Sequence, residues 1–348
     1  MVGGAGKGGI LVRKGQELTS EAVEERLGTG AVIQELSLRT DRLHFRKISG
    51  EGPAEGWIST KLKDKALVVR KNSTPVLVCF YSGGMTAAQG FSHLKDLLDS
   101  AKDSGLETLV LDHATEEPYK TCKDWPSYLE ALQQQVERPE LRSRPLILFA
   151  HSHGSLAAYG LAKRLGKRVL KFFVAARRPP SMPLLDEVWG VSKGADIQSL
   201  DEAALLEGLV GAWRNRMLES MRGSSLPPVA KKILATVREQ YASPCAPGGS
   251  SELDIFKGAD AAIAAPILAF ACSQEKEKGE TASKMEGWRS LTSSSFEMKV
   301  VEADHMDCLA SDDKKTSELV QLLMEDIKKL LQDMSRGKSP EKVLRKGG

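Results

Sequence analysis

The segment from Leu146 to Ala158 constrains the fold of this chain more than any other part of the sequence. It opens with Leu-Ile-Leu-Phe, an apolar run that is typical of a buried strand. A turn centred on Ser152 follows, with Ala150 two positions before it and Gly154 two positions after it. Small residues there allow a strand and a helix to approach each other across a strained turn. The segment therefore predicts a strand–turn–helix element that exposes Ser152 at the edge of a parallel sheet.

Strands and helices alternate from Pro75 onward, a pattern that predicts a parallel sheet covered on both faces. Together with the Ser152 turn, this alternation predicts an α/β-hydrolase fold over residues 73–334. Residues 183–255 read as helices with no strand between them, which is where hydrolases carry a lid over the site. The expected strands are 76–80, 107–111, 146–149, 170–175, 267–272 and 296–301, and the expected helices include 91–100, 125–136 and 319–331.

The first part of the chain has a different pattern. Residues 10–72 contain short alternating apolar runs separated by Gly, Pro and Asp, which predicts a small β module. Within it, Gly56-Trp57-Ile58-Ser59 is similar to the closing strand of SH3-like barrels. We expect residues 1–9 to form a flexible leader and residues 335–348 a polar tail.

Composition excludes several functional classes. A net charge of +3 over 348 residues argues against a nucleic-acid-binding protein. There is no apolar run of the length needed to span a bilayer, and the glycine-rich start lacks the apolar region of a secretory signal. The five cysteines are odd in number and show no paired short spacing, so we expect neither a disulfide framework nor a zinc site. A reducing, cytoplasmic compartment fits this cysteine usage.

A nucleophilic serine needs a base, and the base needs an orienting acid. In α/β-hydrolases the chain order is serine, acid, histidine. His305 is the only histidine that follows the turn segment, and it comes just after the last expected strand. The acid is left open: counting from the end of the strand favours Glu275, whereas counting back from His305 favours Glu277.

An oxyanion hole requires two backbone N–H groups. We expect one from His153, the residue after the nucleophile, and the other from Ser82 or Gly83 in the turn after the first strand. His151 and His153 form a His-x-His pair, but no third ligand lies nearby at metal spacing. We therefore expect this pair to line the pocket, and we expect no metal or cofactor.

Several motifs together resemble those of the type II thioesterases, which edit polyketide, nonribosomal-peptide and fatty-acid synthesis. The resemblance runs from about Val76 to the closing helix. Phe80-Tyr81-Ser82-Gly83-Gly84 is similar to the family's Phe-Pro-x-Ala-Gly-Gly loop, and Ala150-His151-Ser152-His153-Gly154 to its Gly-His-Ser-Met-Gly turn. The run from Ala176 to Pro183, with Arg177-Arg178-Pro179-Pro180, resembles the segment that leads into the family's lid, and the run from Trp288 to His305 resembles the approach to its histidine.

The sequence departs from the family at two points. The family's acid is usually an aspartate, whereas this loop offers only Glu275, Glu277 and Glu280. Met306-Asp307-Cys308 also replaces the aromatic residues that usually follow the histidine.

The resemblance implies a substrate and a partner: an acyl group held as a thioester on the phosphopantetheine arm of an acyl carrier protein or synthase module. Apolar residues of the 183–255 insertion could then form an acyl channel; the candidates are Leu184, Leu185, Val188, Trp189, Leu205, Leu206, Leu209 and Trp213. Two alternatives stay open. One is an esterase, lipase or acyltransferase acting on oxygen esters. The other is a carrier-protein-binding module without catalysis.

Overall fold

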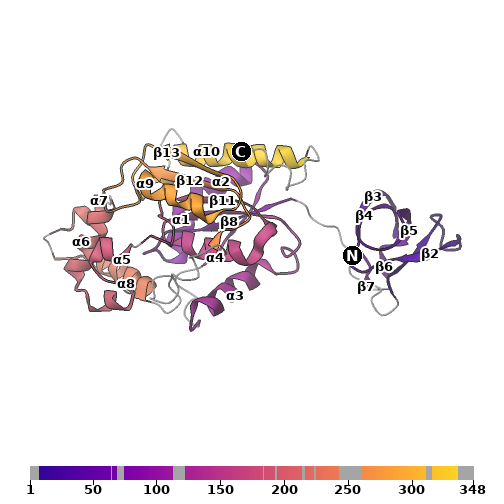
Figure 1. The fold of residues 1–348 in the computed structure, drawn as a ribbon, viewed down its shortest axis with the longest axis horizontal. Helices are drawn as coiled ribbons and strands as arrows, with labels where there is room; N and C mark the ends of the chain where they lie inside the picture. The colour runs from indigo at the N-terminus through magenta and orange to yellow at the C-terminus, as the bar shows by residue number, and fades with distance from the viewer. Residues whose placement is uncertain are drawn as a thin grey trace. The chain divides into compact units, whose positions relative to one another are not determined.

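The computed structural model forms two compact units, residues 1–72 and residues 73–348 (Figure 1). It describes residues 8–63, 65–68, 74–112, 122–182, 184–192, 194–213, 216–222, 225–242, 261–310 and 316–335. Each unit has its own buried apolar core.

The first unit is a five-stranded antiparallel sheet in the order β2-β1-β5-β4-β3. Gly56 in β5 has φ +155°, and a Cβ there would lie 2.4 Å from Val12 Cγ1, so the close contact between β5 and β1 requires glycine. The predicted β module is thus present, while its likeness to SH3 barrels stays a prediction. The strands are β1 (Ile10–Arg13), β2 (Ala22–Leu27), β3 (Val32–Arg39), β4 (Arg42–Ser49) and β5 (Glu55–Ser59), with a short pair β6 (Lys61–Leu62) and β7 (Lys65–Ala66).

The second unit is built on a six-stranded parallel sheet in the order β13-β12-β11-β10-β8-β9. Its strand order reverses between β8 and β10, and ligands of open parallel sheets bind at the carboxyl ends of strands beside such a reversal. The turn containing Ser152 follows β10 and the turn containing Ser82 follows β8, so both meet at this edge. The strands are β8 (Val76–Phe80), β9 (Glu107–Val110), β10 (Leu146–His151), β11 (Val169–Ala175), β12 (Ile267–Cys272) and β13 (Phe296–Val301).

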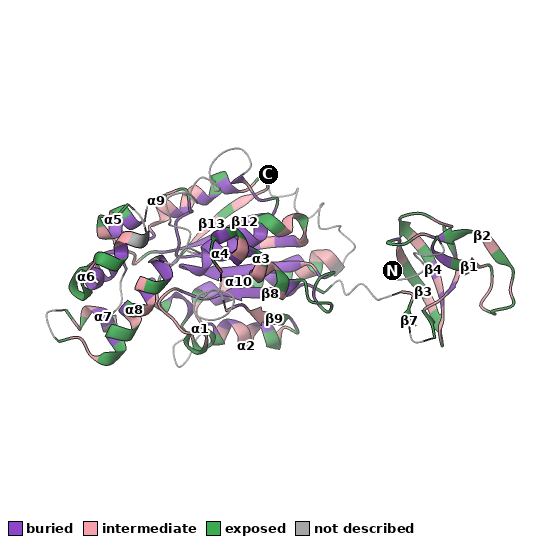
Figure 2. Ribbon diagram, turned by 90° about the horizontal axis from the view of Figure 1, so that it is seen from below, coloured by how far each residue is buried: buried purple, intermediate pink, exposed green. Residues whose placement is uncertain are grey.

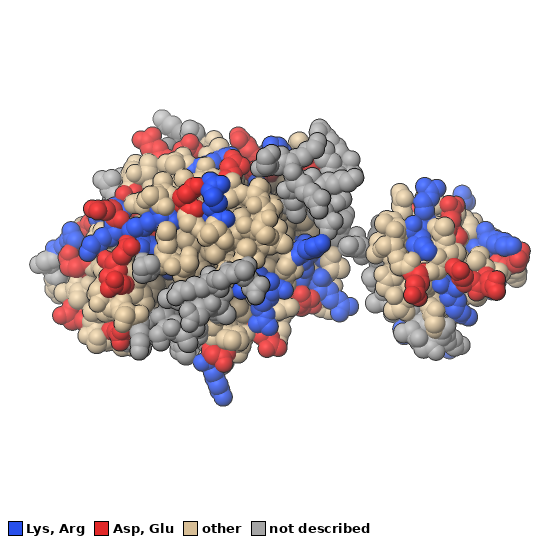
Figure 3. All heavy atoms as spheres, viewed as in Figure 1, with Lys and Arg blue, Asp and Glu red and all other residues tan. Residues whose placement is uncertain are grey.

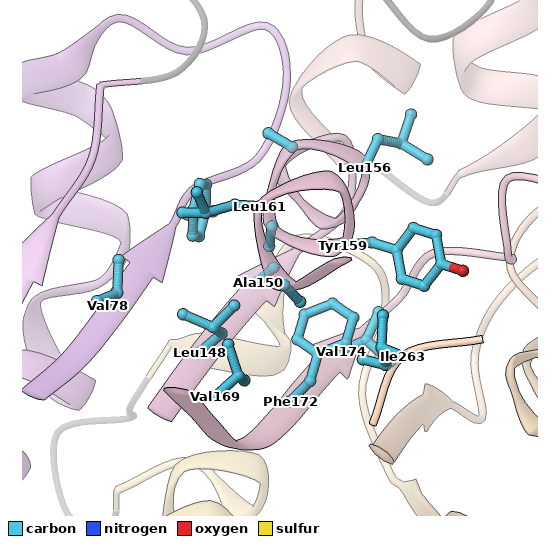
Figure 4. Close-up of a cluster of buried hydrophobic side chains, with 14 of the residues drawn as sticks. Val78, Leu148, Ala150, Leu156, Tyr159, Leu161, Val169, Phe172, Val174 and Ile263 are labelled. Carbon is cyan, nitrogen blue, oxygen red and sulfur yellow. The ribbon is translucent and has the colours of Figure 1, made fainter. Parts of the chain in front are cut away.

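Helices cover both faces of this sheet, whose central strands are buried along their length (Figure 2). Alternate strand residues face opposite layers, as they must in a strand: Val78 and Leu148 belong to one core, Leu77 and Ile147 to the other. Figure 4 shows the first core between the strands and the turn helix α4. Helices α3 (Trp125–Val136) and α4 (Gly154–Leu165) pack on this side, and α2 (Lys95–Asp103) and α10 (Glu318–Ser335) pack on the other.

The described residues of the insertion between β11 and β12 form helices joined by loops and contain no strand, as the sequence predicts for residues 183–255. It has an apolar cluster of its own, which includes Leu205, Val210 and Leu234. Its elements are α5 (Leu185–Trp189), the 3₁₀ helix η3 (Gly194–Ser199), α6 (Glu202–Ala212), α7 (Arg216–Glu219) and α8 (Pro228–Ala242). The expected end of the lid at residue 255 lies outside the described residues.

The expected single helix over 91–100 is instead two helices. The first, α1 (Ala87–His93), starts earlier because Thr86 and Gln89 form a capping box. Leu94, with ψ 0°, separates it from α2. The remaining elements are α9 (Ala282–Met285) and the 3₁₀ helices η2 (Gly166–Arg168), η6 (Glu286–Leu291) and η7 (Asp307–Leu309).

Two surface properties bear on the classes considered above. Over the described part of the chain, no helix combines the length and apolarity that crossing a membrane would take. Figure 3 shows basic and acidic side chains interspersed on the face in view.

Candidate active site

Ser152 occupies the strained turn that the sequence predicts. Its φ is +51°, in the left-handed region that non-glycine residues rarely adopt. The turn is held from both sides: the Ser152 N–H donates to the Ala175 carbonyl at 2.9 Å, and the Ser152 carbonyl accepts from the Ser155 N–H at 3.0 Å. Such a conformation costs on the order of 1–3 kcal/mol and persists only where the surroundings fix it.

Three side chains form a continuous hydrogen-bonded chain at this turn. Ser152 Oγ lies 2.8 Å from His305 Nε2, and His305 Nδ1 lies 2.6 Å from Glu275 Oε1. A carboxylate oxygen accepts a hydrogen bond from Nδ1–H, and in that tautomer Nε2 is free to accept a hydrogen bond from the serine hydroxyl. The side chains of His305 and Glu275 are 4% and 1% exposed, so both are shielded from water. The arrangement is compatible with the nucleophile, base and orienting acid of a serine hydrolase.

The structure distinguishes between the two glutamates that the sequence left open. Glu275 follows β12 and contacts His305. Glu277 is exposed, and its backbone carbonyl accepts a hydrogen bond from Lys284 Nζ at 2.9 Å. The glutamate beside His305 is therefore Glu275, which the count from the end of the strand favours, and not Glu277, which the count back from the histidine favours.

The expected oxyanion groups also meet at Ser152. Ser82, Gly83 and His153 line one cavity together with the serine. A Cβ on Gly83 would lie only 3.0 Å from His153 Cβ, so the two turns come very close at a position where the sequence has glycine. The neighbouring Gly84 N–H donates to Gln240 Oε1 of α8 at 2.6 Å, so a lid side chain fixes this loop. Sequence reasoning missed Gln240, because one polar residue in an amphipathic helix carries no distinguishing pattern.

The cavity has a volume of about 400 Å³ and extends from Ser152 into the lid. The Trp213 ring lies 5.4 Å from the His305 ring, centroid to centroid, so the lid reaches the base directly. Of the lid residues expected to form a channel, Leu209 and Trp213 line the cavity, whereas others such as Leu205 pack inside the lid. The apolar lining comprises Met85, Leu209, Trp213, Leu218, Ile233, Val237, Tyr241 and Met306.

Only one member of the His-x-His pair lines this cavity. His153 does, but His151 is fully buried and its Nε2 lies 2.8 Å from the His305 carbonyl oxygen. A carbonyl only accepts, so His151 Nε2 carries the proton and Nδ1 does not. His93 Nε2, at 3.3 Å, must then donate to His151 Nδ1. This assigns one tautomer to each ring and ties the backbone of His305 to the turn.

Burial keeps both of these histidines neutral. Desolvation is the main reason why the pKa of His93 is lowered to about 4, and the nearby His305 contributes less. Burial, with His93 and His305 nearby, also holds the pKa of His151 well below its ordinary value. Within the described residues, no group of three or more His, Cys, Asp or Glu side chains is placed to hold a metal ion.

Comparison with known proteins places this geometry in a family. The family model of the thioesterase domain matches residues 75–326. A search of curated protein sequences found no match. Many solved structures match this chain, and two of them illustrate the shared fold at low identity. RedJ, the thioesterase of the prodiginine pathway in Streptomyces coelicolor, is 18% identical, with a TM-score of 0.51 over 74% of this chain and 90% of its own.

The second solved structure is a serine-to-alanine mutant of YbtT, the type II thioesterase of the yersiniabactin biosynthetic pathway. It is 12% identical, with a TM-score of 0.50 over 78% of this chain and 96% of its own. These likenesses show the α/β-hydrolase fold, and the family match covers nearly all of the second unit. The chain belongs to the thioesterase domain family.

Proposed function

We propose that this protein is a serine hydrolase that releases acyl groups from acyl-carrier-protein thioesters through an acyl-serine intermediate. The observation that carries the proposal is the chain of hydrogen bonds from Ser152 through His305 to Glu275, which opens onto an apolar cavity. Family membership supports a thioester as the bond cleaved.

In the first half-reaction, Ser152 Oγ attacks the thioester carbonyl while its proton moves to His305 Nε2. The carbonyl oxygen becomes an oxyanion, held by the backbone N–H of His153 and that of Ser82 or Gly83. When the tetrahedral intermediate collapses, the C–S bond breaks and His305 returns the proton to the leaving thiolate. The products are the free phosphopantetheine thiol and an acyl-serine ester.

In the second half-reaction, a water molecule takes the place of the thiol. His305 removes its proton as the water attacks the ester carbonyl, and then protonates Ser152 Oγ as the acyl group leaves. Glu275 holds the imidazole in the Nδ1–H tautomer and stabilises the imidazolium in both steps. The sequence of steps balances without a metal or redox cofactor.

The cavity supports an acyl group as the part of the substrate that is bound. Its lining beyond Ser152 is formed largely by aliphatic and aromatic lid side chains, among them Leu209, Ile233 and Val237. Burying an acyl chain against such side chains releases about 25 cal/mol per Å² of apolar surface. Cys79, Cys122, Cys272 and Cys308 are free thiols, which supports placing the reaction in a reducing, cytoplasmic compartment.

The decisive experiment is mass spectrometry of an acyl-loaded carrier protein incubated with the wild type and with Ser152→Ala. We expect the acyl mass to disappear only with the wild type. Ser155→Ala is the matched control, because Ser155 is also buried, at the start of α4, and its hydroxyl has no hydrogen-bond partner among the described residues. It should retain full activity.

Two other outcomes would redirect the assignment. Cleavage of soluble oxygen esters by the wild type, with the acyl carrier left intact, would favour an esterase or acyltransferase. Failure of Ser152 to react with a fluorophosphonate probe, with carrier binding retained, would indicate a non-catalytic module.

A further inference from the structure

Two consecutive arginines, Arg177 and Arg178, are buried at the carboxyl end of β11, where a charged side chain is costly. They follow Ala176, whose φ of +49° turns the chain sharply away from the sheet. The side chain of Arg178 is 1% exposed, and that of Glu280, its partner, is 0% exposed. The mechanism above makes no use of this buried ion pair.

All but one of the side-chain hydrogen bonds of Arg178 described here go to one loop, residues 278–280, and the other goes to Glu187 of α5. Its backbone N–H and its Nε donate to Glu280 Oε2 at 2.6 and 3.1 Å. Its Nη2 donates to the carbonyls of Lys278 and Gly279 at 2.7 and 3.0 Å, and its Nη1 to Glu187 Oε2 at 2.8 Å. A guanidinium has five N–H donors in a fixed planar fork, so this set fixes both the position and the orientation of residues 278–280.

The same loop packs against the carboxylate that orients His305. The Glu280 N–H donates to Glu275 Oε2 at 3.4 Å, while Glu275 Oε1 accepts from His305 Nδ1. A Cβ on Gly279 would lie 2.5 Å from Glu275 Oε2 and 2.3 Å from the Ala212 carbonyl oxygen. The loop backbone therefore forms one wall of the Glu275 pocket, at a separation that only glycine allows.

We propose that Arg178 and Glu280 are positioning residues for Glu275: they fix the 278–280 loop so that the Glu275 carboxylate is held in line with His305. This inference rests on the proposed function. A displacement of about 1 Å in a catalytic group can cost roughly 100-fold in rate. Arg178→Lys retains the charge but loses the fork that joins the two carbonyls to the Glu280 and Glu187 carboxylates. We therefore expect kcat to fall about 10- to 100-fold with KM unchanged.

Arg168 offers a matched control. It precedes β11 at the opposite end of the strand and also fixes a loop, through the carbonyls of Val136 and Leu141 and the carboxylate of Glu137. Arg168→Lys should lower the melting temperature about as much as Arg178→Lys does, and leave kcat unchanged well below that temperature.

A double-mutant cycle gives the test that a merely structural role would not pass. The readout is the rate at which a fluorophosphonate labels Ser152, followed by intact-protein mass spectrometry. In a Glu275→Gln background, Arg178→Lys should change this rate less than about threefold, because the carboxylate through which Arg178 acts is already lost. A full multiplicative loss in that background would overturn the proposal. So would an equal loss of kcat in Arg168→Lys.

Failure of the proposed function gives a different result, in which Glu275→Gln alone retains wild-type activity. If Arg178→Lys does not fold, Glu280→Gln serves as the second variant, because it preserves shape and removes only the charge. It should lower kcat in the wild-type background and have no further effect beside Glu275→Gln.

Discussion

Shortening the acid by one methylene should uncouple it from the base. Glu275 Oε1 lies 2.6 Å from His305 Nδ1. Glu275→Asp withdraws the carboxylate by about 1.5 Å, one C–C bond, so the separation becomes about 4 Å and exceeds the hydrogen-bond limit. The imidazole then loses its fixed tautomer and orientation. We expect kcat to fall about 100-fold, equivalent to about 2.7 kcal/mol of transition-state stabilisation.

The assay is steady-state hydrolysis of a small acyl thioester, because it separates kcat from KM. KM should change little, since Glu275 is not among the residues that line the cavity. Glu277→Asp is the matched control: it makes the same chemical change at an exposed position two residues away, and should retain full kcat. If Glu275→Asp keeps at least one third of wild-type kcat, the carboxylate position does not matter and the reasoning is wrong.

Two further predictions concern the oxyanion loop and the buried histidines. Gly83→Ala places a Cβ 3.0 Å from His153 Cβ, so it should lower kcat at least tenfold with little change in melting temperature. Gly211→Ala is the control: its Cβ meets no atom within 4 Å, so this variant should keep full activity. The pKa of His93 is lowered to about 4 in the folded protein, so as the pH falls below 6.5 the unfolded chain protonates this histidine before the folded protein does. The free energy of unfolding should therefore fall between pH 6.5 and 4, by up to about 3 kcal/mol. His93→Gln should reduce that loss in urea titrations across this range, and an unchanged pH dependence would contradict the argument.

The sheet could be predicted because each of its strands has a local pattern. Short apolar runs such as Val76–Phe80 and Ile267–Cys272 are too short for buried helices and alternate with amphipathic segments. The strained turn at Ser152 could be predicted for the same reason, because its small flanking residues lie within the same pentapeptide. The break at Leu94 between α1 and α2 has no comparable local mark, and a single helix was the natural prediction.

The histidines show the limit of local reasoning. A His-x-His pair in a turn looks like two equivalent pocket residues, yet His151 belongs to a strand, and its ring lies against the His305 backbone and the His93 ring. Those partners are 154 and 58 residues away in the sequence. The tautomers follow from simple valence rules once the contacts are known, but the contacts depend on how α1 and the loop after β13 meet.

The three glutamates of the loop after β12 occupy different environments. Glu275 is nearest to β12 and extends inward to His305, whereas Glu277 is exposed. Glu280 is buried too, but its carboxylate is taken by Arg178. The arginine comes from the far side of the lid insertion, 102 residues earlier, so no count along the loop could assign these roles. An aspartate at position 275 would leave its carboxylate short of His305 for as long as Arg178 holds the loop in place. A glutamate-to-aspartate change at position 275 should therefore be tolerated only where the loop that Arg178 fixes is itself rebuilt.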